Sequence, residues 1–170
     1  GTPYPALMVG LNLGFSYKNI DFTANFYGTF GNDIFNKTKG LYSGVSGQND
    51  WAGTLQKAWH GEGTSNDIPR LSYNDLNQNY TRVSSFYVED CSYMRCKLLQ
   101  VGYSLPKKRL NGTELRLSLS AQNPFTITSY SGMDPERPQI GKDGSVIETG
   151  IDGIAYPNPR TFLFGIDLKF

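Results

Sequence analysis

One stretch decides the fold: Leu7-Met8-Val9-Gly10-Leu11-Asn12-Leu13-Gly14-Phe15-Ser16-Tyr17. Its odd-numbered positions are all apolar or aromatic, whereas Met8 is the only apolar residue at an even-numbered position. Successive side chains of a β-strand point to opposite faces of the sheet. The stretch therefore predicts a strand with one continuous apolar face and one face of mostly small polar residues.

The same alternation returns four times later in the chain, so the sequence predicts five antiparallel strands. They are expected near residues 6–17, 22–31, 92–105, 113–122 and 160–170. In the third run, Arg95 and Lys97 are expected on the same face as the apolar Leu99 and Val101.

The connections between these runs alternate in length. Short turns are expected at 18–21 and 106–112, and long loops at 32–91 and 123–159, the first loop without a clear strand or helix over most of its length. This alternation is typical of outer-membrane β-barrels, in which the short turns are periplasmic and the long loops extracellular. A tilted run of about ten residues also spans roughly 25 Å, the height of the apolar band of such a barrel.

A secreted β-sandwich that binds glycan is the alternative, because the strands of a sandwich also alternate. The polar face of a sandwich meets water and should carry charges, whereas the polar positions of the first two runs carry none. The negative mean hydropathy of the chain agrees with either fold, because alternation hides apolar strands from an average. We therefore favour an all-β fold, an antiparallel transmembrane β-barrel segment.

Composition excludes several classes of function. The chain has 16 Lys and Arg against 15 Asp and Glu, and a net charge of +1 argues against nucleic acid as the main partner. The single histidine, His60, cannot form a multi-histidine metal site, and it is the only candidate for a histidine-based triad. Cys91 and Cys96 lack the spacing of a zinc knuckle and are expected to be free thiols. We expect no enzyme, no metal and no cofactor.

Closure of a barrel constrains the number of its strands. Bacterial single-chain barrels have an even number of strands, and an open sheet edge is not tolerated in lipid. Five strands are therefore expected to be the last part of a longer chain. The final run resembles the C-terminal signal that the barrel-assembly machinery reads, although a row of lipid-facing residues is the simpler interpretation. Its alternating residues are Phe162, Phe164, Ile166, Leu168 and Phe170.

Several motifs follow one another in the second half of the chain. They are Tyr87-Val88-Glu89-Asp90, Ser92-Tyr93-Met94-Arg95, Gly102-Tyr103-Ser104-Leu105-Pro106, Gln122-Asn123-Pro124-Phe125-Thr126, Tyr130-Ser131-Gly132-Met133-Asp134-Pro135-Glu136 and Tyr156-Pro157-Asn158-Pro159-Arg160-Thr161-Phe162. In this order they resemble the C-terminal motifs of the SusC/RagA family of TonB-dependent outer-membrane receptors. The chain departs from the family pattern at Cys91, Cys96 and Pro124, which puts local packing in doubt but not the family.

The resemblance implies a large barrel of about 22 strands, filled by a plug domain of the same protein and set in outer-membrane lipid. It also implies import of oligosaccharides or peptides in Bacteroidetes, a SusD-like surface lipoprotein as a lid, and energy from the TonB complex. This chain would supply the last five strands, while the plug and the TonB-binding segment would belong to the absent N-terminal region.

The long loops contain residues suited to contact with a ligand or with the lid. Aromatic rings stack on sugar faces or peptide side chains, and polar side chains fix orientation. The candidates are Tyr42, Trp51, Trp59, His60, Tyr130, Arg137 and Tyr156, with Asp67 and Asp134 as carboxylates nearby in the sequence. Packing of the loops against themselves is the alternative role for each. Asp134-Pro135-Glu136 does not complete a calcium-binding pattern and is expected to be a turn.

Overall fold

The computed structural model describes residues 1–42, 52–106, 113–136, 150–153 and 156–169. The chain forms two compact units. The first, here called the loop unit, comprises Gly1–Pro3, Asp33–Asp90 and Ser131–Tyr156. The second, the sheet unit, comprises Tyr4–Asn32, Cys91–Tyr130 and Pro157–Phe170.

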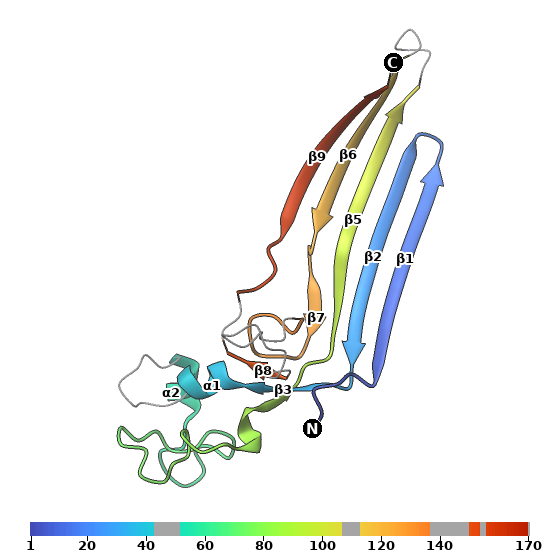
Figure 1. The fold of residues 1–170 in the computed structure, drawn as a ribbon. Helices are drawn as coiled ribbons and strands as arrows, with labels where there is room; N and C mark the ends of the chain where they lie inside the picture. The colour runs from blue at the N-terminus through green and yellow to red at the C-terminus, as the bar shows by residue number, and fades with distance from the viewer. Residues whose placement is uncertain (43–51, 107–112, 137–149, 154–155, 170) are drawn as a thin grey trace, which may run out of the picture. The chain divides into compact units, whose positions relative to one another are not determined.

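The sheet unit is an antiparallel sheet (Figure 1). Its main strands lie in the order β1-β2-β5-β6-β9, and a short strand, β7, pairs with β5 beyond the end of β6. This arrangement confirms the prediction of an all-β, antiparallel fold. The strands are β1 (Leu7–Tyr17), β2 (Ile20–Phe30), β5 (Tyr93–Leu105), β6 (Glu114–Gln122), β7 (Thr126–Thr128) and β9 (Thr161–Lys169).

The two ends of the sheet differ in their connections. Tyr17 pairs with Ile20, so β1 and β2 are joined by Lys18 and Asn19 alone, and Lys18 has the positive φ of 53° that tight hairpin turns require. At the opposite end Thr29 pairs with Tyr93, and Gln122 with Thr161. Both long connections therefore leave from the same end of the sheet. Most of the expected turn at 106–112 lies outside the described residues.

Many apolar side chains of this sheet are exposed. Phe15 is 62% exposed, Leu119 63% and Phe162 77%. Each square ångström of apolar surface left in water forgoes about 25 cal/mol of stabilisation. In a β-sandwich a second sheet would cover this face. The exposed face is instead what a strand needs when its surroundings are hydrocarbon.

A β-bulge in β5 changes the face of the sheet on which Arg95 lies. The register between β2 and β5 shifts at Asn25 and Phe26, so Leu98 lies opposite Asn25 and Cys96 opposite Phe26, with Lys97 as the extra residue. The shift reverses the alternation of β5 at this point. Arg95 was expected on the apolar face, but it lies opposite Tyr27 on the other face.

The loop unit is built on a small sheet in which β3 (Asp33–Asn36) pairs antiparallel with β4 (Val88–Asp90) and parallel with β8 (Ile151–Asp152). The helices α1 (Lys37–Tyr42) and α2 (Ala52–Lys57) and the 3-10 helix η1 (Ser85–Tyr87) lie between β3 and β4 in the sequence. The expectation of a first long loop without clear elements was therefore wrong. These elements are too short for hydrophobic periodicity to reveal them.

Among the helices that the structure describes, none has the length and apolar character needed to cross a membrane.

Candidate functional site

The predicted contact residues do not form one cluster. Trp59 and His60 follow α2 in the loop unit, and both are exposed. Tyr130 belongs to the sheet unit, where it is buried and 6% exposed, so its ring is a packing residue. Tyr156 is 82% exposed. Trp51, Arg137, Phe170 and the side chain of Tyr42 lie outside the described residues.

Trp59 forms one wall of a cleft of about 360 Å³ in the loop unit. The lining residues are Trp59, Ser65, Asn66, Asp67, Ile68, Pro69, Arg70, Asn79, Ser84 and Phe86. Sequence reasoning selected Trp59 and Asp67 from this set and missed Asn66, Arg70 and Asn79, which no motif marks. His60 does not line the cleft.

Backbone hydrogen bonds hold the Trp59 wall. Ala58 forms a parallel β-bridge with Ile68, and the Trp59 N–H donates to the Ile68 carbonyl at 2.9 Å. The Ser65 hydroxyl accepts from the N–H groups of Asp67 at 3.3 Å and Ile68 at 3.2 Å. The segment that carries Asp67 is therefore closed back onto the segment that carries Trp59.

The opposite wall is fixed by Asp75. Its carboxylate accepts hydrogen bonds from the N–H groups of Asn79 at 2.8 Å, Tyr80 at 3.1 Å and Thr81 at 3.0 Å, and from the Thr81 hydroxyl at 3.0 Å. Burial raises the pKa of Asp75, but these donors outweigh it and hold the pKa below its usual range. All four donors belong to residues 79–81, so the Asp75 carboxylate holds this segment in place and is a structural residue.

Tyr80 connects the two walls. Its hydroxyl donates to the Pro69 carbonyl at 2.9 Å, and its own carbonyl accepts from the Tyr87 hydroxyl at 3.2 Å. Both tyrosine rings are buried. Apart from the Ser65 and Ser84 hydroxyls, which accept from backbone N–H groups, the walls of the cleft are held by groups other than the polar side chains that line it.

Glu89 joins the two long connections inside the loop unit. It accepts from the Ser131 N–H at 3.1 Å and from the Ser131 hydroxyl at 2.7 Å, and it lies 3.1 Å from the Lys39 ammonium. Burial raises the pKa of Glu89, but the hydrogen bonds from Ser131 and Lys39 outweigh it and lower the pKa below its usual range. Lys39 also lies over the Phe86 ring, 4.4 Å from its centre. Glu89 and Ser131 come from two of the motifs quoted above.

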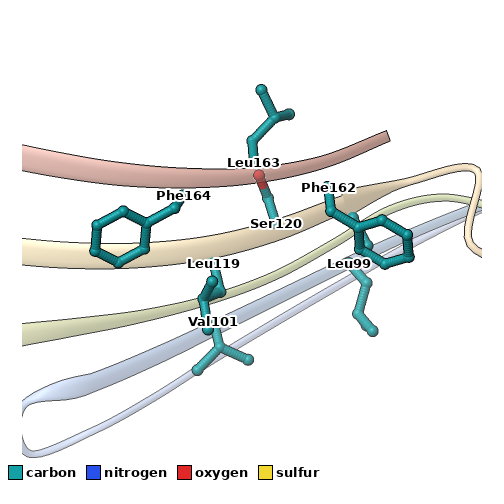
Figure 2. A pocket seen from close by; sticks show the side chains of 8 residues that line it. Leu99, Val101, Leu119, Ser120, Phe162, Leu163 and Phe164 are labelled. Atoms are coloured by element: carbon teal, nitrogen blue, oxygen red, sulfur yellow. The ribbon is translucent and has the colours of Figure 1, made fainter. Parts of the chain in front are cut away.

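The sheet unit carries an apolar groove of about 400 Å³ (Figure 2). Leu99, Val101 and Leu119 extend to one side of the sheet, and Leu163 extends to the other. Phe162 and Phe164 also line the groove, on the terminal strand that was considered as an assembly signal. A wide, shallow apolar surface of this kind suits hydrocarbon chains better than a polar ligand.

The described residues provide little for metal or redox chemistry. Within them, no group of three or more His, Cys, Asp and Glu residues is placed to hold a metal ion. Cys91 and Cys96 are buried free thiols, as the sequence predicted. The Asp134 carboxylate accepts from the Glu136 N–H at 3.0 Å, which is the geometry of a turn.

Comparison with known proteins finds relatives along the whole chain. "TonB-dependent receptor P3" of Formosa agariphila is 37% identical over 175 residues, covering 100% of this chain and 17% of that protein. "TonB-dependent receptor SusC" of Bacteroides thetaiotaomicron is 28% identical, covering 99% of this chain and 15% of that protein. The chain thus spans about a sixth of the length of these relatives. No protein-family model matches it.

A solved structure shares the fold. The structure of the RagAB peptide importer in the "closed-closed" state matches with a TM-score of 0.77 and 25% identity. The match covers 99% of this chain and 18% of the solved chain.

Proposed function

Because this chain is a segment of a SusC-like TonB-dependent receptor, we propose that the whole protein imports nutrients across the bacterial outer membrane. The chain contributes five neighbouring strands of the barrel, β1, β2, β5, β6 and β9. The short turn at Lys18 and Asn19 is periplasmic, and the loop unit is extracellular.

One observation carries this proposal: the sheet unit is a single antiparallel layer whose apolar face is exposed. A barrel strand needs such a face toward lipid and a polar face toward the lumen. The different lengths of the connections at the two ends support the orientation, because outer-membrane barrels have short turns inside and long loops outside.

The partners follow from the same assignment. A SusD-like surface lipoprotein covers the extracellular mouth of the barrel, and lipid surrounds the apolar face. The plug and the rest of the barrel belong to other parts of the same protein, and the TonB complex acts through one of those parts. The substrate is an oligosaccharide or a peptide. The RagAB structure is that of a peptide importer, which supports import without deciding between these two classes.

Import is tested in cells that lack the receptor gene. We expect these cells to lose uptake of one labelled nutrient, oligosaccharide or peptide, and to regain it with the full-length gene but not when TonB is inactivated. The receptor should also be found in the outer-membrane fraction and migrate faster on a gel before heating than after it. Uptake that is unchanged by loss of the gene, or a receptor found free in the periplasm, would contradict the proposal.

A further inference from the structure

We propose that the Trp59 cleft binds a neutral saccharide, an inference that rests on the proposed import function and names the substrate class. The first step concerns the walls. The Ile68 carbonyl, the Ser65 hydroxyl and the Asp75 carboxylate hold the backbone of the cleft through the bonds described above. A site whose walls are already held loses little conformational freedom when a ligand binds.

The second step concerns the polar side chains in the cleft. Asp67 and Arg70 are both exposed, and in the described part of the chain neither side chain has a hydrogen-bond or ion-pair partner. Asn66 is also exposed, and in the described part of the chain its side chain likewise has no hydrogen-bond partner. Ser65 and Ser84 both line the cleft and accept hydrogen bonds from its backbone, whereas the side chains of Asn66, Asp67 and Arg70 line it without such a role in the described part of the chain, which leaves these three available to a ligand.

The third step is chemical complementarity. A carboxylate only accepts hydrogen bonds, a guanidinium only donates them, and an amide does both. A sugar hydroxyl donates and accepts, so Asp67, Arg70 and Asn66 can all pair with hydroxyls of one sugar. The charges of Asp67 and Arg70 cancel, so the cleft needs no charged ligand. The indole of Trp59, 39% exposed, offers a flat apolar face for the C–H side of a pyranose ring.

A peptide fits this surface less well. Peptides are commonly held by a free strand edge or by apolar pockets for their side chains. Among the described residues of the cleft, the β-pairing is limited to the single bridge between Ala58 and Ile68. Six of the ten residues that line the cleft are polar or charged. Its volume of about 360 Å³ is near the lower end of ligand pockets, roughly 300–1,000 Å³. The cleft would therefore hold one part of an oligosaccharide, with the remainder contacting other parts of the receptor.

The test uses the full-length receptor purified with its lipoprotein partner. The probes are an array of neutral plant, algal and fungal oligosaccharides and, separately, tryptic peptides of casein. For a bound oligosaccharide, Trp59→Ala is expected to weaken binding roughly tenfold, and Asp67→Asn is expected to weaken it severalfold. Tyr73→Ala and Glu62→Gln are the matched controls, because both residues are exposed in the loop unit and neither lines the cleft.

Every outcome decides the inference. It is supported if an oligosaccharide binds, the two cleft variants weaken binding and the two controls do not. It is overturned if no oligosaccharide binds, if only peptides bind, or if Trp59→Ala binds like Tyr73→Ala. Uptake in cells separates this result from the function itself. If Trp59→Ala leaves TonB-dependent uptake unchanged, the saccharide site is contradicted but the import function is not. If the unmodified receptor supports no uptake at all, the import proposal is contradicted.

Discussion

The guanidinium of Arg116 in β6 donates two hydrogen bonds to the carboxylate of Asp21 in β2, although β5 lies between these strands. The distances are 3.1 Å to Oδ1 and 2.7 Å to Oδ2. Gly102 of β5 lies opposite Asp21 in the register, and a Cβ atom there would be 2.6 Å from Asp21 Oδ2. The absence of a side chain at Gly102 therefore allows the ion pair to cross the strand. Arg116 also reaches Asp167 of β9 at 3.4 Å, so one network links side chains of three strands, β2, β6 and β9, across β5.

The first prediction follows from this crossing. Gly102→Ala should separate Arg116 from Asp21, and we expect a loss of about 1–2 kcal/mol of stability from overpacking and the weakened ion pair. The measurement is the temperature at which the folded gel form of the full-length receptor converts to the unfolded form. Gly14→Ala is the control, because a Cβ atom there would meet nothing within 4 Å. Equal melting of the two variants would contradict the role of Gly102.

The second prediction concerns pH and the loop unit. The pKa of Glu89 is lower in the folded protein than in the unfolded chain, so its carboxylate stabilises the fold above its unfolded pKa. This stabilisation is lost as the pH falls through the folded pKa, which is below the ordinary range for glutamate. We expect the Ser131 amide to lose protection from hydrogen exchange in that acidic window, after correction for the intrinsic pH dependence of exchange.

Glu89→Gln separates this effect from general acid unfolding. The variant keeps the shape of the side chain but loses the charge that Lys39 and Ser131 contact. We expect it to reduce Ser131 protection at neutral pH by about 1–3 kcal/mol and to remove the acid dependence. A Glu89→Gln variant that still loses protection over the same acidic range would show that another group titrates there.

The third prediction tests which face of β1 meets lipid. Leu11 and Asn12 are adjacent and exposed in the middle of the strand, and they point to opposite faces. A lysine facing the bilayer midplane costs about 2–4 kcal/mol, whereas one facing the lumen does not. We expect Leu11→Lys to reduce the folded receptor in the outer membrane strongly, and Asn12→Lys to leave most of it folded. The reverse order would place the apolar face toward the lumen.

The strand β1 shows why the sheet was predictable. Its eleven residues alternate with Met8 as the one exception, and such a run has only one arrangement that places all the other apolar side chains on one face. Arg95 shows where this reasoning fails. The bulge at Lys97 reverses the alternation, and no residue in the run marks the position of the extra residue.

The cleft was predictable only in part, for a related reason. Trp59 and Asp67 stand out by residue type in a polar loop, so sequence reasoning selected them. Arg70 and Asn79 line the same cleft because the Tyr80 hydroxyl reaches the Pro69 carbonyl. That contact joins residues eleven positions apart in an irregular segment, and no repeating pattern encodes it. Tyr130 was also selected by residue type, and it is buried, because an aromatic residue in a loop motif is equally suited to packing.

The last prediction separates two roles of the terminal strand. Phe164 lies opposite Leu119 on the exposed apolar face, and Leu163 is its neighbour on the other face. If the alternating row from Phe162 to Phe170 guides assembly, Phe164→Ala should lower the amount of folded receptor but barely change the melting temperature of the fraction that folds. If the row only contacts lipid, the melting temperature should fall, and the amount of folded receptor should fall with it. Leu163→Ala removes an exposed apolar side chain from the opposite face, so it should not reproduce an assembly defect. An equal loss of folded receptor in both variants, at unchanged melting temperature, would argue against a signal carried by the apolar row.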